Sequence, residues 1–536
     1  MALLALAIPA GVTAEDNRNR SHKHRHYKLI DMGTFGGPGS FVNDGIGLVN
    51  NIVGLNGRGV AWGASATSTP SLPTSNTTLV CNGIDVLGGI GFVTHAFRWQ
   101  NGTVTDLGAL LGDTNCSIPM AISAGGEIVG ISENGQVDPL TGVNETRAVR
   151  WKEGEIEDLG SFGGNQSAAL RTNHAGQIVG WSLNSVPDPY SPIDLVLGSS
   201  NGTQTRAVLW QHGVMQDLGT LGTGNDAIAG LINKNGQIAG ISYTMAAANP
   251  ATGIPTQNPF FWENGTMQDI GSLGGAIGFT TAMNNRGQVI GVSSIAANPG
   301  ACLFSGEGDP NCHPFLWDRG KLIDLNTSSF GGNPLIAYGI NDAGEVVGIG
   351  AFPNAPSDAY LWKEGAATDV GHLSDCGSFA NAINSHSQVV GGTFSCQDGS
   401  HARAFLWEKG SMIDLNSVTP ANSPLHLVVA FGINDRGEIV GEGVPPGVPP
   451  ANYNSQGHSF LLIPCDEHDT GVEGCDYALV DPPATASRAN TAVRMSIAPA
   501  GGQCGEAVKS STHCLSGSTR QTQLSRGEIT RYSEGI

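Results

Sequence analysis

Apolar residues in this chain fall into short runs separated by tight-turn sequences. One segment reads Phe405-Leu-Trp407-Glu-Lys-Gly410-Ser-Met-Ile-Asp414, in which a residue pair ending in glycine separates two apolar runs. A pair of the form X-Gly between two such runs is typical of a two-residue β-hairpin, because glycine readily takes the positive φ that a type I′ turn requires. The pattern therefore predicts a hairpin of two short strands.

This hairpin recurs seven times with one fixed spacing. A Trp is followed three residues later by Gly and seven residues later by Asp, and successive copies lie 45 to 59 residues apart. Self-similarity at such a period indicates a repeat architecture. The repeated residues are Trp99, Trp151, Trp210, Trp262, Trp317, Trp362 and Trp407, with Asp106, Asp158, Asp217, Asp269, Asp324, Asp369 and Asp414.

A second hairpin follows the first in each unit. Its turn has the form Asn-x-x-Gly, as in Ile433-Asn434-Asp-Arg-Gly437, which suits a type I turn with glycine in the left-handed region. The form is degenerate at Ser123 and at Ser387, where Ser replaces the Asn and the Gly respectively. Two hairpins per unit predict a four-stranded antiparallel sheet.

Several four-stranded sheets at a period of about 40–50 residues are typical of a β-propeller. Residues 27–33 match the second strand of the Trp–Asp hairpin but have no first strand before them. At the end of the repeat region, residues 458–464 match the first strand of that hairpin but have no second strand after them. Pairing these two segments would complete a blade and leave no open edge. We therefore predict an all-β, eight-bladed propeller over residues 27–464. Seven blades or an open β-solenoid are the alternatives.

Residues shared by every unit are most simply structural. Counting Asp31, the Asp recurs eight times, whereas acid–base catalysis needs one asymmetric group of differently tuned side chains. We expect the Asp residues to cap loops by accepting backbone N–H groups, and the Trp residues to pack between sheets. The sequence contains no nucleophile, zinc, phosphate-loop or calcium-loop motif, so we expect no catalytic residue, metal or cofactor.

Loops that vary between units are the better candidates for a binding site. In a four-stranded meander the two tight turns lie at one end of the blade, and the two longer connections lie at the other. Because loops on a rigid scaffold usually carry binding, we expect a ligand on the face with the long connections. Trp181 and Tyr190 are the candidates, as aromatic residues without repeat counterparts; local packing is the alternative. We interpret His174 and His212, in turns of the opposite face, as solvated.

The composition limits the compartment and the partners. The 46 acidic and 26 basic residues give a net charge of −20, which disfavours a nucleic-acid partner. Residues 1–14 resemble a signal peptide, residues 15–26 form a basic, His-rich linker for which metal binding is a minor alternative, and no other run is long enough to span a membrane. Residues 465–536 lack periodicity and are expected to be disordered or pinned by a disulfide.

Ten cysteines in an exported chain indicate disulfides. Spacing suggests four local pairs and leaves Cys81 and Cys116 over. The expected pairs are Cys302–Cys312, Cys376–Cys396, Cys465–Cys475 and Cys504–Cys514.

The units resemble the extracellular HAF repeat, named for His-Ala-Phe. The motif reads His95-Ala-Phe97 here, with variants at His313-Pro-Phe315 and His458-Ser-Phe460, and the Trp, the Asp-Leu-Gly-x-Leu-Gly-Gly loop and the Asn turn also match. The resemblance implies a secreted or surface-located bacterial protein and supplies no reaction or catalytic residue. We therefore expect a binding or adhesion propeller that recognises an extracellular glycan or surface protein. The alternative is an extracellular lyase or glycosidase that acts on polysaccharides.

Overall fold

The structure is a computed structural model that describes most residues from 24 to 480. The gaps are 43–53, 72–90, 141, 143, 193–201, 297–301, 303–310, 327–335, 353–356, 374–376, 395–400, 466–474 and 477–478. All described residues belong to one compact unit, Met1–Ala489. The remaining unit, Asn490–Ile536, lies outside them and includes Cys504 and Cys514. Cys81, Cys376 and Cys396 also fall outside the described residues.

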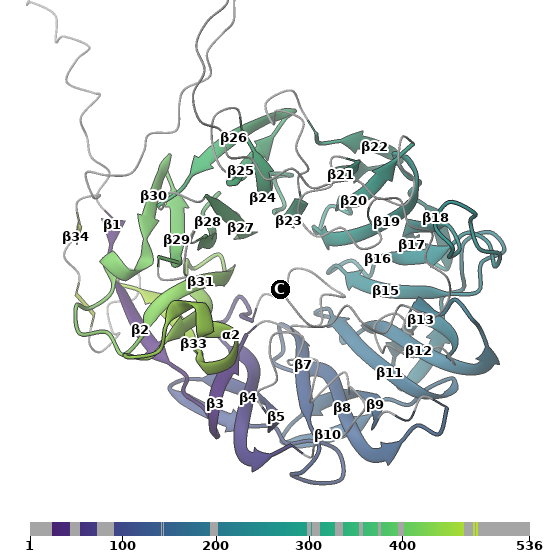
Figure 1. The fold of residues 1–536 in the computed structure, drawn as a ribbon, viewed down its shortest axis with the longest axis horizontal. Coiled ribbons are helices and arrows are strands. Elements are labelled where there is room, and N and C mark those ends of the chain that lie inside the picture. Colours follow the sequence, from purple (N-terminus) through teal and green to yellow (C-terminus); the bar gives the residue numbers. More distant parts are fainter. Residues whose placement is uncertain are drawn as a thin grey trace, which may run out of the picture. The chain divides into compact units, whose positions relative to one another are not determined.

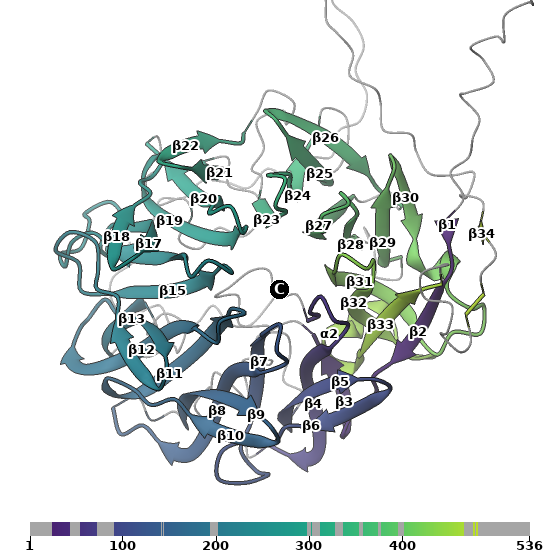
Figure 2. The ribbon, with the colours of Figure 1, turned by 180° about the vertical axis from the view of Figure 1, so that it is seen from behind.

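Strands β2 to β33 form eight four-stranded antiparallel blades, and single bridges join blade 4 to blade 5 and blade 7 to blade 8. Figures 1 and 2 show the blades of this unit following one another around a common centre, with first strands such as β7, β15 and β23 nearest to it. Blade 1 holds β3 (Gly36–Phe41), β4 (Ala61–Pro70), β5 (Phe92–Gln100) and β6 (Thr103–Asp106); blade 2 holds β7 (Ser117–Ile122), β8 (Ile128–Val137), β9 (Asn144–Lys152) and β10 (Glu155–Asp158); blade 3 holds β11 (Gly163–Thr172), β12 (Ile178–Pro187), β13 (Thr203–Gln211) and β14 (Val214–Asp217); blade 4 holds β15 (Ala227–Ile232), β16 (Ile238–Tyr243), β17 (Gln257–Glu263) and β18 (Thr266–Asp269).

The second half of the ring repeats this arrangement. Blade 5 holds β19 (Gly274–Met283), β20 (Val289–Ile295), β21 (Cys312–Asp318) and β22 (Lys321–Asp324); blade 6 holds β23 (Ile336–Ile340), β24 (Val346–Ala351), β25 (Ser357–Lys363) and β26 (Ala366–Gly371); blade 7 holds β27 (Ser378–Ile383), β28 (Val389–Thr393), β29 (Arg403–Glu408) and β30 (Ser411–Asp414); blade 8 holds β31 (His426–Ile433), β32 (Ile439–Val444), β33 (His458–Pro464) and β2 (Tyr27–Asp31). Short helices η3 (Leu415–Val418), η4 (Pro450–Asn452) and α2 (Tyr453–Gln456) lie in connections of the last two blades.

Blade 8 is built from both ends of the repeat region. Strand β2 pairs antiparallel with β33, from Tyr27 opposite Pro464 to Asp31 opposite Phe460. The predicted split-blade closure is therefore confirmed, and the described residues form eight blades rather than seven or an open solenoid.

Short segments beyond the propeller are also ordered. Strand β1 (His24–Arg25), inside the expected linker, pairs with β34 (Leu479–Val480), inside the expected tail. These residues of the expected tail thus form a strand pair with the expected linker. Two of the expected disulfides, Cys302–Cys312 and Cys465–Cys475, are present. Cys116 is also disulfide-bonded, although spacing alone left it without a partner.

A glycine in the second strand of each blade allows the first strand to approach closely. In blade 5 a Cβ at Gly291 would lie 2.1 Å from the Phe279 carbonyl oxygen and 2.7 Å from Phe315 Cζ. A bulge in β19 between Thr280 and Ala282 accompanies this approach, and the fully buried Phe315 pairs directly opposite the glycine. The same crowding occurs at Gly63, Gly130, Gly180, Gly240, Gly348, Gly391 and Gly441.

A buried asparagine in the turn between the first and second strands uses its whole hydrogen-bonding capacity. In blade 5, Asn284 Oδ1 accepts the backbone N–H groups of Arg286 and Gln288, each at 3.0 Å. Its Nδ2 donates to Gln288 Oε1 at 2.7 Å and to the carbonyl oxygen of Asn341, in blade 6, at 2.9 Å. The amide therefore shapes its own turn and binds the next blade at the same time.

We call this inter-blade hydrogen bond the amide clasp. It recurs at seven of the eight blade boundaries within the described residues, including the boundary from blade 8 to blade 1. The donors and the acceptor carbonyls are Asn56 to Ser123 (3.4 Å), Asn173 to Asn233 (3.1 Å), Asn233 to Asn284 (3.2 Å), Asn284 to Asn341 (2.9 Å), Asn341 to Asn384 (3.1 Å), Asn384 to Asn434 (3.0 Å) and Asn434 to Asn56 (3.1 Å). Blade 2 carries Ser123 at the donor position, and its clasp to blade 3 is missing.

Replacing Gly291 by alanine should destabilise the fold, because the new Cβ meets backbone that cannot move without breaking the β19–β20 ladder. Overpacking of this kind typically costs about 1–3 kcal/mol. The measurement is the free energy of unfolding in urea together with the melting temperature. Gly57→Ala is the matched control, because no heavy atom lies within 4 Å of a Cβ built there. Equal stability of the two variants would contradict the packing explanation.

Candidate functional site

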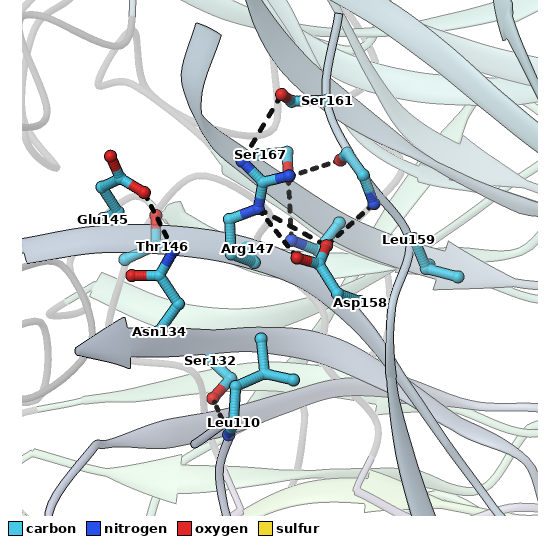
Figure 3. Close-up of polar contacts among 12 residues, drawn as sticks. Leu110, Ser132, Asn134, Glu145, Thr146, Arg147, Asp158, Leu159, Ser161 and Ser167 are labelled. Atoms are coloured by element: carbon cyan, nitrogen blue, oxygen red, sulfur yellow. Dashed lines mark hydrogen bonds and ion pairs between the residues drawn. The ribbon is translucent and has the colours of Figure 1, made fainter. Parts of the chain in front are cut away.

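The repeated Asp residues each cap the loop that follows the fourth strand. Each accepts the backbone N–H of the residue two positions later, at 2.7–2.9 Å, as Asp106 does from Gly108. Such caps order the Asp-Leu-Gly loops that lead into the next blade. A serine of the next blade holds the same loop: Ser132 Oγ accepts the Leu110 N–H at 2.9 Å (Figure 3).

The His of the His-Ala-Phe motif pairs with this same Asp. His95 Nδ1 lies 3.0 Å from Asp106, and His313 and His458 make the same contact with Asp324 and Asp31. Burial lowers the pKa of His95, but the hydrogen bond to Asp106 and its charge outweigh this and raise the pKa above its ordinary value. Because the contact recurs around the ring, it does not mark one catalytic blade.

Other blades keep the pair with different chemistry. Arginine replaces the histidine in three blades, and Figure 3 shows Arg147 reaching both Asp158 and Ser161. Blade 6 exchanges the partners, so that Asp358 on the third strand binds His372 at 2.9 Å. Burial raises the pKa of Asp358 to about 6. The remaining polar pairs are Arg206–Asp217, Arg403–Asp414 and Asn258–Asp269.

The structure does not support the aromatic pair that the sequence suggested. Trp181 lies on β12 and is only 1% exposed, packed in the main hydrophobic cluster with no ring face open to a ligand. It follows Gly180, at the position where other blades carry Ile131, Ile241 or Val292, so it does have repeat counterparts. Tyr190 is half-buried in the following insert, where its backbone N–H donates a hydrogen bond to Asp188 Oδ1.

A charged cavity of about 580 Å³ lies on the face that carries the Asn turns and the X-Gly hairpins. It spans three blades, opposite to the face on which we expected a ligand. Its lining comes from Arg98 of blade 1, the 123–127 turn with Arg150, Lys152 and Glu153 of blade 2, and His174, Ala175, Gly176, His212 and Gly213 of blade 3. The missing clasp lies at this place, because Ser123 forms part of the wall.

The cations of this cavity are departures from the repeat. Arg98 and Arg150 each precede the repeated Trp, where the other six blades carry a buried leucine or phenylalanine. The six apolar counterparts are Leu209, Phe261, Leu316, Leu361, Leu406 and Leu461, and none is more than 9% exposed. A charged side chain at a position that favours apolar burial is costly unless another group pairs with it.

The two arginines differ in their partners. Arg150 binds Glu157 at 2.5 Å, and the neighbouring Lys152 binds Glu127 at 2.7 Å. Arg98 Nε is buried and has no hydrogen-bond partner among the described residues. The cavity therefore holds one arginine whose Nε lacks a partner within the described residues, beside two imidazoles that can donate further hydrogen bonds.

A second cavity, of about 450 Å³, lies on the face with the long connections. Pro420, Pro445 and Pro446 line it together with Asn416 and His426. It contains no charged pair and brings no acidic residues together. Its chemistry is less specific than that of the charged cavity.

Two buried carboxyl groups meet between blades 3 and 4. Asp226 is 1% exposed; its Oδ1 accepts the Thr205 N–H at 2.6 Å, whereas Oδ2 lacks a hydrogen-bond donor among the described residues. Burial raises the pKa of Asp226 to about 7, and the charge of Asp188 adds to this effect. Blade 3 places the neutral Gln166 at the equivalent position, where its Oε1 accepts the Thr146 N–H at 2.8 Å.

No group of three or more His, Cys, Asp or Glu side chains suited to a metal ion occurs among the described residues. Within the same residues, no helix is long and apolar enough to cross a bilayer.

Comparison with known proteins identifies propellers among solved structures. The β-propeller domain of the Trilobed protease from Pyrococcus furiosus aligns with 73% of this chain and 96% of its own, at 11% identity and a TM-score of 0.37. Dipeptidyl peptidase 4 from Porphyromonas gingivalis aligns over 76% of this chain and 60% of its own, at 10% identity and a TM-score of 0.38. Acylaminoacyl peptidase from Pyrococcus horikoshii aligns over 66% of this chain and 52% of its own, at 10% identity and a TM-score of 0.37.

These similarities concern the fold alone, and the chain spans little more than half the length of the two whole peptidases. No protein-family model and no curated protein sequence matches the chain.

The Asp226 carboxyl should make stability depend on pH. Its folded-state pKa of about 7 lies above the ordinary value of 3.8, so the folded protein binds more protons than the unfolded chain between those values. Its contribution to stability therefore falls as pH rises from about 4 to about 7. Asp226→Asn should melt increasingly higher than the wild type as pH increases through this window.

Melting curves from pH 5 to pH 8 test this, with the difference between variant and wild type as the readout. Asp358 and Glu442, whose pKa values burial raises to about 6 and about 8, are unchanged in the variant, so the difference isolates Asp226. Gln166→Glu should introduce a similar slope at the neighbouring boundary. A constant difference across the range would refute the assignment.

Proposed function

We propose that this chain is a secreted or cell-surface binding propeller of the HAF-repeat type whose ligand carries negative charge. The single observation behind this proposal is the charged cavity across blades 1 to 3. A cavity of about 580 Å³ lies within the size range typical of small-molecule sites, and its polar groups converge from several elements.

The electrostatics favour an anion in particular. The chain has a net charge of −20, yet three of its 26 basic residues line this one cavity. Arg98 is half-buried and its Nε lacks a partner within the described residues. A guanidinium binds carboxylate or sulfate oxygens through strong, paired hydrogen bonds. An anionic ligand would provide the partner that Arg98 lacks.

The export part of the proposal rests on the disulfides. Cys302–Cys312, Cys465–Cys475 and the bonded Cys116 are compatible with an oxidising compartment. The carboxyl groups of Asp188 and Asp226 are at most 5% exposed, so they offer no open site to a polysaccharide. Among the described residues, the geometry thus favours binding over a lyase or glycosidase.

The test is a binding measurement with anionic and neutral glycans on the purified full-length protein. Arg98→Leu installs the residue type found at this position in other blades, so the fold should persist. A charge-assisted hydrogen bond contributes about 1.5–3 kcal/mol, so binding of polygalacturonate or dextran sulfate should weaken roughly ten-fold or more. Binding should also weaken with added salt.

Arg319→Gln is the matched control, because this hairpin cation is 83% exposed and lies outside the cavity. Neutral dextran controls for charge-independent binding. Equal losses for the Arg98 and Arg319 variants would indicate general surface attraction, and failure of every anion to bind the wild type would refute the proposed function.

A further inference from the structure

The amide clasp and the charged cavity are two aspects of one local change in the repeat. At the other boundaries a buried Asn side chain extends to the carbonyl oxygen of the next blade, as Asn284 does at 2.9 Å. Blade 2 has Ser123 instead, and its Oγ accepts the Glu127 N–H of its own turn at 3.1 Å. A serine side chain reaches one atom less far than asparagine and has no amide to donate.

The acceptor on blade 3 consequently lacks its inter-blade donor. The Asn173 carbonyl oxygen accepts the Gly176 N–H of its own turn at 3.2 Å, and a weak contact from Thr172 Oγ1 lies at 3.5 Å. No hydrogen bond from the described residues of blade 2 reaches it. The nearest substitute is a guanidinium contact from Arg171 to the Met120 carbonyl oxygen, at 3.4 Å.

The cavity lies beside the missing clasp, and residues of the turns on both sides of this boundary line it. Ser123, Gly125 and Gly126 belong to the turn of blade 2, and His174 and Gly176 belong to the turn of blade 3. Arg98 joins from blade 1. A molecule bound here contacts three consecutive blades across the boundary at which the described residues form no amide clasp.

The lining also narrows the chemistry of the ligand. Arg98, His174 and His212 are donors for an anionic group, whereas Glu127 and Glu153 are acceptors that repel anions and bind hydroxyl groups. A simple polyanion would place charge against both glutamates. A sugar that bears a carboxylate beside its hydroxyl groups satisfies both sets of side chains.

We propose that a uronic-acid-containing oligosaccharide binds in this cavity and takes the place of the missing amide clasp, so that ligand binding and closure of the blade 2–blade 3 boundary are coupled. This inference rests on the proposed function, since it specifies the ligand and the consequence of binding at the same site. It adds that Ser123 is a specificity-determining residue, because asparagine there would rebuild the clasp and close the site.

The experiment compares the wild type with Ser123→Asn and with Asn341→Ser, in the full-length protein. Ser123→Asn restores a clasp donor at the cavity, whereas Asn341→Ser removes one at a boundary far along the sequence. The probes are trigalacturonate, a neutral galactose trisaccharide and sodium sulfate. Calorimetry gives the affinity, and melting without ligand gives the stability.

Ser123→Asn should melt a few degrees above the wild type without ligand and bind trigalacturonate at least ten-fold more weakly. Asn341→Ser should melt below the wild type and keep the wild-type affinity. The neutral trisaccharide and sulfate should bind the wild type at least ten-fold more weakly than trigalacturonate. Unchanged affinity in Ser123→Asn would overturn the clasp replacement while leaving an anion-binding propeller intact.

Sulfate binding as strong as trigalacturonate binding would overturn the uronic-acid assignment alone. Absence of binding by every anion would instead remove the proposed function itself. Hydrogen exchange on the wild type provides a readout that needs no variant to fold. Trigalacturonate should slow exchange in the 123–127 and 173–176 turns and leave the 341–344 turn unchanged; equal effects at both places would contradict the local coupling.

Discussion

The ring depends on one buried side chain that serves two blades at once. An asparagine amide has two donors and one acceptor oxygen, and the turn geometry uses all of them, two hydrogen bonds on each side as at Asn284. An unsatisfied buried amide would be costly, so the turn and the neighbouring carbonyl must be placed together. The local turn and the packing of adjacent blades are therefore a single constraint, repeated around the propeller.

The same constraint explains why the chain ends must meet. The clasp from Asn434 to the Asn56 carbonyl oxygen joins blade 8 to blade 1, and β2 completes blade 8 against β33. A propeller that stayed open would leave both a clasp donor and a sheet edge without partners. Closure thus uses the backbone at the outer edge of the sheet and a side chain at its inner edge.

Much of this scaffold could be predicted from the sequence because it depends on spacing. The two complementary half units were sufficient to predict the split blade, and X-Gly pairs were sufficient to place the hairpins. The pairing of His95 with Asp106 was harder, because the two residues are diagonal neighbours across a hairpin and are separated by eleven residues in the chain. The clasp was harder still, since its partner is a carbonyl oxygen in another blade.

The candidate site was missed for a different reason. Trp181 attracted attention as a residue type that is rare in the repeat, but its position is one that most blades fill with a buried side chain, such as Ile131 or Val292. The informative residues belong to common types but stand at unusual positions. Arg98 and Arg150 replace a leucine or phenylalanine of the other blades, and Ser123 replaces an asparagine. A comparison by position within the unit would have singled them out, although the sequence alone could not show that they surround one cavity.

The substitutions at these positions have an energetic meaning that the repeated residues lack. Burying a leucine side chain contributes about 1.5–3 kcal/mol, and blades 1 and 2 forgo that contribution where they carry Arg98 and Arg150. Among the described residues, the boundary in this region is the one without an amide clasp. Arg98 Nε is also buried there without a hydrogen-bond partner within those residues. These three features each lower the stability of the same region. A purely structural role does not explain them, because a residue that another blade already carries would avoid each loss. Such violations of local consistency are expected where function, rather than folding, determines the residue.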